Sequence, residues 1–225
     1  MRINKYVAFA SGMSRRSADK AIDDHHVRVN GVIAEAGIQV SDQDTILLDD
    51  KPLRLPEEVT TILLNKPAGY ICSRNGQGGK TIYDLLPIHM HKLKPVGRLD
   101  KDSSGLLLLT NDGQLANQLT HPSFQKIKIY KVELNKKLEP LHRQMITDMG
   151  IQLEDGPSKF NLERIDQDND KVWQVIMHEG RNRQVRRTFD ALGYKVFKLH
   201  RTQFGNYELG TVKSGTFRQL NDQTI

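Results

Sequence analysis

The chain has 225 residues, of which 37% are hydrophobic and 27% charged, and this composition excludes a disordered polymer. Its formal charge of +6 favours a polyanionic partner. Its single cysteine, Cys72, excludes an internal disulfide and argues against a thiolate zinc site, so we expect neither a metal nor a cofactor. No stretch approaches the ~20 apolar residues of a membrane helix, and residues 1–5 do not lead into the apolar core of a signal peptide, so we expect a cytoplasmic protein without a membrane partner.

Residues 1–55 have the pattern of a small α/β module. A first helix is predicted by apolar residues at helical spacing, namely Ile3, Tyr6, Val7 and Ala10, and Ser11-Gly12 ends it. Ser14 is suited to cap a second helix that begins at Arg15. The segment Val27–Ile33 predicts a hairpin with Asn30-Gly31 as its turn, and Ile46–Leu48 predicts another strand.

Positive charge in this module is concentrated on its helical side. Residues 1–30 hold six Lys or Arg against three Asp or Glu, whereas residues 31–59 hold two against seven. Arg15 and Arg16 are placed at a helix N-terminus, where free N–H groups already favour anions, so this pair is a candidate phosphate contact. The alternative is that the two arginines merely solvate the helix.

A short polar linker is expected at 56–60, followed by one larger domain over 61–225. Its strands are expected at Thr61–Leu64, Gly105–Thr110, Ile127–Leu134, Phe160–Ile165, Val172–Met177 and Tyr194–Leu199. Its helices are expected at Thr81–Leu86, Gln114–Leu119, Leu138–Met149 and Asn182–Leu192. This order predicts an α+β domain with a mixed, mostly antiparallel sheet and flanking helices.

The segment Pro95–Gly113 joins a charged loop to a short apolar strand. Asp100 lies in this loop between Arg98 and Lys101, and such neighbours keep a carboxylate ionised, which suits a nucleophile or a base. Two other interpretations remain open. Asp100 can be a turn residue that caps the following serines, or it can form a metal pair with Asp102, although the adjacent cations oppose a metal.

A second candidate is the segment Gly180–Arg187, which contains four arginines at a predicted loop-to-helix junction. Arg183 and Arg186 are spaced to share a helical face. Residues 180–201 together carry seven cations and one acid, which is typical of a polyphosphate-binding surface, and a solvated basic helix is the alternative. Tyr130 is a third candidate, because an aromatic residue in an alternating strand either packs in the core or stacks on an RNA base.

Taken in order, these motifs resemble those of the RsuA/RluB-type ribosomal RNA pseudouridine synthases. The matching pieces are Lys66–Gly69, Gly97–Asp100, Gly105–Gly113, Tyr130 and Gly180–Arg187. Ser103 departs slightly from the family, whose members often carry threonine there, and it keeps the hydroxyl. The first 50 or so residues resemble the RNA-binding module of the ribosomal protein S-four family, through Ser14–Arg16 and Val27–Gly31.

The resemblance implies a cofactor-free isomerisation of a uridine in ribosomal RNA, with the large-subunit RNA slightly preferred. It implies that Asp100 is the nucleophile or base, that Tyr130 stacks on the uracil and assists proton removal from carbon 5, and that Arg186 pairs with the aspartate. The remaining residues implied to bind substrate are Arg98, Leu199, Arg183, Arg181 and Lys66, with Arg15, Arg16 and Arg28 binding RNA in the small module. The expected partner is ribosomal RNA or a ribosome assembly intermediate, and the protein is expected to be a monomer.

Two other classes of function compete with this interpretation. One is a non-catalytic RNA-binding or ribosome-assembly protein that keeps the fold. The other is a metal-dependent nuclease built on Asp100 and Asp102. Base conversion by the unmodified protein separates the first from an enzyme, and a requirement for a divalent metal identifies the second.

Overall fold

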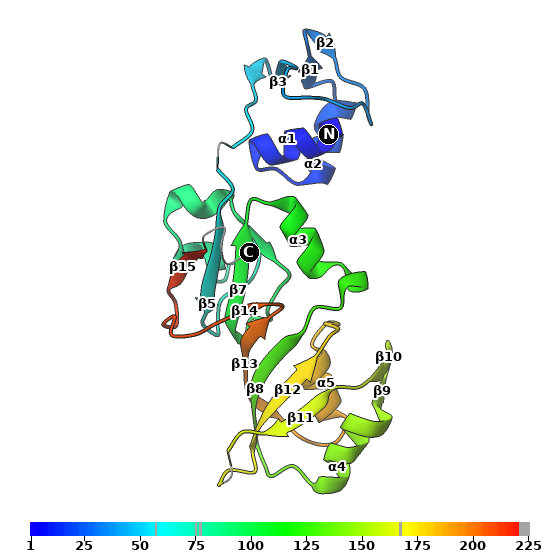
Figure 1. Cartoon of the computed structure of the whole chain (residues 1–225), viewed down its shortest axis with the longest axis vertical. Helices are drawn as coiled ribbons and strands as arrows, with labels where there is room; N and C mark the ends of the chain where they lie inside the picture. Colours follow the sequence, from blue (N-terminus) through cyan, green and yellow to red (C-terminus); the bar gives the residue numbers. More distant parts are fainter. Residues whose placement is uncertain (57, 75, 77, 167, 221–225) are drawn as a thin grey trace. The chain divides into compact units, whose positions relative to one another are not determined.

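The structure is a computed structural model that describes residues 1–56, 58–74, 76, 78–166 and 168–220 (Figure 1). The chain forms two compact units: Met1–Thr60 with Asn111–Gly113, and Thr61–Thr110 with Gln114–Ile225. Of the linker expected at 56–60, Glu57 lies outside the described residues, as do the last five residues of the expected larger domain.

The first unit contains two helices and a four-stranded sheet. Its elements are α1 (Ile3–Ser11), α2 (Arg15–Asp23), β1 (Val27–Val29), β2 (Val32–Ile33), β3 (Ile46–Leu48) and β4 (Lys51–Pro52), with strand order β2-β1-β3-β4. Ser14 caps α2 as predicted, because its Oγ accepts a hydrogen bond of 3.0 Å from the Ser17 N–H. Asn30 and Gly31 both have positive φ, as a two-residue hairpin turn requires.

The second unit is built on one nine-stranded sheet. Its strands are β5 (Thr61–Lys66), β6 (Lys94–Val96), β7 (Ser104–Thr110), β8 (Lys128–Leu134), β11 (Asn161–Arg164), β12 (Val172–Met177), β13 (Val196–Phe204), β14 (Tyr207–Glu208) and β15 (Phe217–Leu220). A separate hairpin is formed by β9 (Ile151–Leu153) and β10 (Gly156–Ser158). The helical segments are η1 (Ile82–Leu85), η2 (Ile88–Lys92), α3 (Gly113–Thr120), η3 (Pro122–Phe124), α4 (Pro140–Gln144), η4 (Met145–Met149) and α5 (Gln184–Asp190). In the described parts of the chain, no helix has the length and apolar character needed to cross a membrane.

The main path of this sheet runs β11-β12-β8-β13-β7-β5-β15, with β14 paired to β13 and β6 paired to β7 (Figure 1). Every strand pair described in it is antiparallel except β13 with β7, which is parallel. The predicted class, an α+β fold with a mixed and mostly antiparallel sheet, is therefore confirmed.

Several elements differ from the sequence-based expectation. The helix expected over 138–149 is divided, because the wider turn η4 follows α4 before Gly150 ends it at φ 82°. The helix expected from Asn182 begins only at Gln184, since Arg183 adopts a left-handed conformation with φ 47°. The hairpin β9–β10 was not anticipated, because its strands are three residues long and contain Gly156-Pro157, a pattern typical of a loop.

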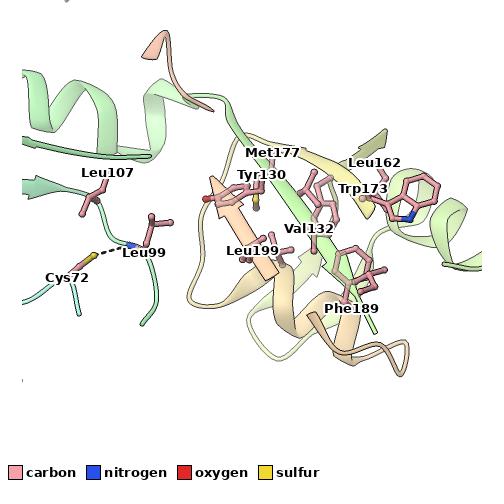
Figure 2. Packing of buried hydrophobic residues seen from close by; sticks show 14 of the residues in the cluster. Cys72, Leu99, Leu107, Tyr130, Val132, Leu162, Trp173, Met177, Phe189 and Leu199 are labelled. Atoms are coloured by element: carbon pink, nitrogen blue, oxygen red, sulfur yellow. Dashed lines mark hydrogen bonds between the residues drawn. The ribbon is translucent and has the colours of Figure 1, made fainter. Parts of the chain in front are cut away.

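Strand β7 is buried on both faces, which explains why its sequence is continuously apolar. Leu107 and Leu109 pack in the larger core cluster, whereas Leu106 and Leu108 pack in a second cluster on the other face. The larger cluster continues into the other half of the sheet, where Tyr130, Val132, Trp173, Phe189 and Leu199 pack together (Figure 2). A strand covered on both sides provides a rigid support for the loop that precedes it.

The parallel junction between β7 and β13 is short and tightly packed. It has two paired positions, His200 with Ser104 and Arg201 with Gly105. A Cβ atom on Gly105 would lie 2.2 Å from the Arg201 carbonyl oxygen, and Gly105 has φ 104°. Only glycine fits a backbone approach of this kind. The junction therefore fixes β7, and the loop that leads into it, against the strand pair β8–β13.

We predict that Gly105→Ala lowers the free energy of unfolding by about 2 kcal/mol or more, because the added methyl group meets backbone atoms that cannot move independently. Urea unfolding of the purified protein measures the change. Gly113→Ala is the matched control, since a Cβ there meets nothing within 4 Å, and its effect should stay within about 1 kcal/mol. Equal effects of the two substitutions would contradict the packing argument.

Candidate active site

A cavity of about 910 Å³ opens in the second unit, within the size range of sites for small molecules and nucleotides. It is lined by the loop that contains Asp100, by strands β8 and β13, and by the segment that leads into α5. Of the residues singled out in the sequence, those lining the cavity are Arg98, Asp100, Tyr130, Arg181, Arg183 and Leu199. Residues from distant parts of the chain therefore meet at one concave surface.

The Asp100 loop is held from below by a buried lysine. Lys66 lies at the end of β5 and is fully buried, and its Nζ donates to the carbonyl oxygens of Pro67 (3.0 Å), Asp100 (3.1 Å) and Ser103 (2.7 Å). Burial lowers the pKa of the Lys66 ammonium. An ammonium group has three donors, and all three are used here. Lys66 does not line the cavity, and its charge holds the loop, so substrate binding by Lys66 stays a prediction.

Asp100 and Asp102 share one arginine. Arg183 Nη1 lies 3.7 Å from Asp100 Oδ2, and the same guanidinium donates two hydrogen bonds, of 2.9 and 3.1 Å, to the two carboxylate oxygens of Asp102. These bonds from Arg183 lower the pKa of Asp102, and the bond to Asp102 raises the pKa of Arg183. The Asp100 side chain is 28% exposed, so its carboxylate is accessible from the cavity.

Arg186 has a different position from the one expected. Its Nη1 donates to the Val196 carbonyl at 2.8 Å, and its Nη2 donates to the Asp102 carbonyl at 2.9 Å and to Ser103 Oγ at 3.3 Å. Its Nε lies 3.4 Å from Asp102 Oδ2. Arg186 does not line the cavity, and the ion pair expected between it and Asp100 is made by Arg183 instead. The role of Arg186 in this structure is to attach the loop to β13.

Tyr130 and Leu199 form the apolar side of the cavity. Both are almost fully buried, at 8% and 6% exposure, and both also belong to the main core cluster (Figure 2). They come from neighbouring antiparallel strands, because Leu199 pairs with Val132 and Arg201 pairs with Tyr130. The two interpretations left open for Tyr130 are thus compatible: the ring packs in the core and also borders the cavity.

Two further arginines hold the β9–β10 hairpin. Arg181 donates to the carbonyls of Asp155, Gly156 and Pro157 and to the Asp155 carboxylate, at 2.8 to 3.1 Å. Arg187 donates to both oxygens of the same carboxylate, at 3.1 and 2.7 Å, and this contact lowers the pKa of Asp155. Each of the four arginines of Gly180–Arg187 therefore has an acidic partner within the chain, and the four acids are Asp155, Glu179, Asp102 and Asp100. The sequence did not reveal the pairs with the aspartates because these acids lie far from the arginines along the chain.

Other cations of the cavity keep their charge available. Arg98 is exposed, lines the cavity, and makes no hydrogen bond or ion pair with any residue that the structure describes. Lys126 and Lys128, which were not singled out in the sequence, also line the cavity, as does Arg201, one of the seven cations of residues 180–201. The positions of Lys128 and Arg201 could have been predicted from strand periodicity. Lys128 is two residues from Tyr130 on β8, and Arg201 is two residues from Leu199 on β13, so each cation shares a face of its strand with a predicted site residue.

In the first unit, Arg15 and Arg16 are exposed at the start of α2. Arg15 makes one long hydrogen bond, of 3.4 Å, to Asn4 Oδ1. Arg28 Nε lies 3.6 Å from Asp50 Oδ1 in a solvent-exposed pair, and such pairs contribute little. These side chains are placed where a polyanion can reach them.

The paired carboxylates do not form a cation site of the kind a nuclease uses. Asp100 and Asp102 both face the guanidinium of Arg183, which occupies the position a cation would need. Among the residues that the structure describes, no group of three or more His, Cys, Asp or Glu side chains is arranged to hold a metal ion.

Comparison with known proteins adds to this geometry. Residues 60–191 match the family model described as RNA pseudouridylate synthase, and residues 1–46 match the S4 domain. The chain belongs to the RNA pseudouridylate synthase family. It is a pseudouridine synthase with an N-terminal S4 domain, as its sequence motifs predicted.

Relatives of this synthase span almost its whole length. It is 37% identical over 230 residues to "Ribosomal large subunit pseudouridine synthase B" of Bacillus subtilis, covering 100% of this chain and 93% of the relative. It is also 37% identical over 231 residues to "Ribosomal small subunit pseudouridine synthase A" of Haemophilus influenzae, covering 100% and 98%. A crystal structure of a pseudouridylate synthase matches with a TM-score of 0.71 at 36% identity, covering 99% of this chain and 97% of the other.

We predict that Lys66→Met lowers the free energy of unfolding by about 2 to 4 kcal/mol, because three buried carbonyls lose a charged donor. Chemical denaturation measures the loss. The exposed neighbour Lys101 provides the control, and Lys101→Met should change stability by no more than about 0.5 kcal/mol. A Lys66→Met protein of normal stability with weakened RNA binding would instead identify Lys66 as a ligand-binding residue.

Proposed function

We propose that this synthase converts a specific uridine of ribosomal RNA to pseudouridine, using the carboxylate of Asp100 and no cofactor. The observation that carries the proposal is the meeting of Asp100, Tyr130 and Leu199 at one cavity in a chain of this family. The names of the relatives support ribosomal RNA as the substrate class, since the two described above are ribosomal pseudouridine synthases.

The reaction is an isomerisation, so its atoms balance without a co-reactant. The bond between ribose C1′ and uracil N1 breaks, a bond between C1′ and C5 forms, C5 loses a proton and N1 gains one. Asp100 either attacks C1′, giving an ester, or removes a ribose proton, giving a glycal. Both routes require a carboxylate that reaches the ribose, and Asp100 lines the cavity beside the cationic Arg183.

The apolar side of the cavity suits the base while it is detached. Tyr130 and Leu199 present a tyrosine ring and an aliphatic side chain where a flipped uracil would stack and turn over. Tyr130 is also placed to assist removal of the C5 proton. Extruding the base costs a few kcal/mol, which backbone contacts elsewhere on the RNA must offset.

We propose that the S4 domain supplies part of those contacts through Arg15 and Arg16, with Arg28 nearby on β1. The large-subunit RNA is the preferred substrate, because Ser14–Arg16 and Glu179–Arg183 look closer to the RluB-type sequences. Overall identity favours neither subunit, being 37% to both relatives. The synthase is expected to act as a cytoplasmic monomer on free RNA or on an assembly intermediate.

The role of Asp100 is tested by Asp100→Asn, which keeps the size of the side chain and removes its charge. We predict complete loss of pseudouridine formation with RNA affinity largely kept, measured by mass spectrometry of transcripts of both ribosomal RNAs and by filter binding. Asp190→Asn, at an exposed position of α5 outside the cavity, is the control and should retain activity. Activity that survives in Asp100→Asn would remove this carboxylate from the reaction.

The role of the S4 domain is tested by replacing Arg15 and Arg16 together with glutamine. We predict weaker RNA binding and a decrease of about one to two in the slope of log affinity against log salt, because each lost phosphate contact contributes about 0.7 to 0.9. Affinity measured over a salt series gives the slope. Lys51→Gln, on the acidic side of the same unit, should leave the slope unchanged, and an unchanged slope in the double variant would exclude these arginines as contacts.

A further inference from the structure

Two cations in the cavity are close to each other and lack an acidic partner. Lys128 on β8 and Arg201 on β13 both lie over the ring of Phe204, at 5.6 and 4.8 Å from its centroid. Both residues line the cavity that contains Asp100. Neither makes an ion pair within 4.0 Å with any acidic side chain that the structure describes.

Arg201 is the more deeply buried of the two. It is 2% exposed, its Nε donates to the Leu106 carbonyl at 2.8 Å, and its Nη2 is buried without a hydrogen-bond partner among the described residues. A buried guanidinium without a carboxylate is costly, and an unsatisfied buried donor adds to that cost. The cation–π contact with Phe204 offsets only part of it.

Lys128 is likewise a cation without a carboxylate partner among the described residues. Its Nζ donates to two neutral acceptors, the carbonyls of Lys126 at 3.2 Å and of His178 at 3.0 Å. Burial lowers the pKa of Lys128, repulsion from Arg201 lowers it further, and the smaller effect of Glu179 opposes the change. Two like charges that disfavour each other in this way are stabilised by an anion placed between them.

The contrast with the arginine-rich segment shows that this arrangement is specific. The charges of Arg181 and Arg187 are paired with Asp155, and the charge of Arg183 is paired with Asp102 and Asp100. The synthase thus supplies its own anions to the arginines around α5 and supplies none to Lys128 and Arg201. The missing anion must come from the ligand of the cavity.

We propose that Lys128 and Arg201 form a phosphate-binding subsite that holds one phosphodiester of the RNA next to the nucleotide under reaction. The identity of the ligand as RNA rests on the proposed function. A phosphodiester fits because it carries one full negative charge and can accept from both an ammonium and a guanidinium, whereas a neutral base carbonyl would leave the two cations uncompensated. The subsite places the backbone beside Tyr130, since Arg201 is paired with Tyr130 across the two strands.

The test measures RNA binding without chemistry, in the Asp100→Asn background, over a salt series with a transcript of the large-subunit ribosomal RNA. Lys128→Gln and Arg201→Gln each keep a neutral donor for the carbonyls they contact now. We expect each to lower the salt slope by about 0.7, so that between ~50 and ~200 mM salt its affinity falls about three-fold less than that of the parent. Lys128→Arg, which keeps the charge, should restore the parental slope.

Lys131→Gln is the matched control, because Lys131 follows Tyr130 on β8 and its side chain is exposed on the opposite face of the strand. It should leave the slope at the parental value. The melting temperature of each variant is measured alongside, and Lys128→Gln keeps the test decisive if Arg201→Gln proves unstable. A folded Lys128→Gln protein with the parental slope would overturn the subsite.

The outcome is independent of the proposed reaction. If the protein without the Asp100 substitution forms no pseudouridine in ribosomal RNA, the proposed function fails. The subsite is still supported in that case if Lys128→Gln lowers the slope of log affinity against log salt. If pseudouridine forms and both Lys128→Gln and Arg201→Gln keep the parental salt slope, the subsite is contradicted and the proposed reaction is not.

Discussion

The structure of the catalytic unit depends on one buried ammonium group. Lys66 ends a strand whose residues are all buried, and its three hydrogen bonds go to carbonyls on two segments of chain, Pro67 on one side and Asp100 and Ser103 on the other. A further backbone bond, from Gly69 N–H to the Lys101 carbonyl at 2.6 Å, closes the same pair of segments. Removing a charge from water is unfavourable unless each of its donors is satisfied. The loop is therefore fixed at the residue that carries the Asp100 carboxylate.

The same loop is held from its other side by arginines around α5. Arg186 contacts both the backbone and the side chain of Asp102. Arg183 donates two hydrogen bonds to the Asp102 carboxylate and also lies near Asp100. Asp102 therefore makes the short hydrogen bonds with Arg183, whereas Asp100 Oδ2 lies 3.7 Å from Arg183 Nη1. As a result, the Asp102 carboxylate is bound by two arginines, and the Asp100 carboxylate lines the cavity.

Much of this arrangement was predictable from sequence where the signal is local. The alternation of Lys128–Leu134, the continuous apolar run before Thr110 and the Asn30-Gly31 turn each determine an element through neighbouring residues, and each is present. One cavity contains Asp100, Tyr130 and Leu199, and their roles in a common site stay predictions.

Prediction failed where the outcome depends on which distant charges meet. Asp100 and Asp102 are two residues apart, and the sequence does not reveal that Asp102 receives the bidentate contact from Arg183. Nothing in the sequence singled out Asp155, yet it forms ion pairs with Arg181 and Arg187, two of the arginines that predicted a phosphate-binding surface. The sequence around Lys66 likewise gives no sign that its side chain is buried beneath the loop that contains Asp100.

The short junction at Gly105 has a mechanical consequence. Strand β13 is joined to β8 through seven paired positions and β7 to β5 through six, but β13 and β7 share only two. The carboxylate of Asp100 is anchored to one side of this narrow seam, and the ring of Tyr130 belongs to the other. A change in the twist of the sheet about the seam would alter the separation of these two groups, and the contacts of Arg183 and Arg186 with the Asp100 loop oppose such a change.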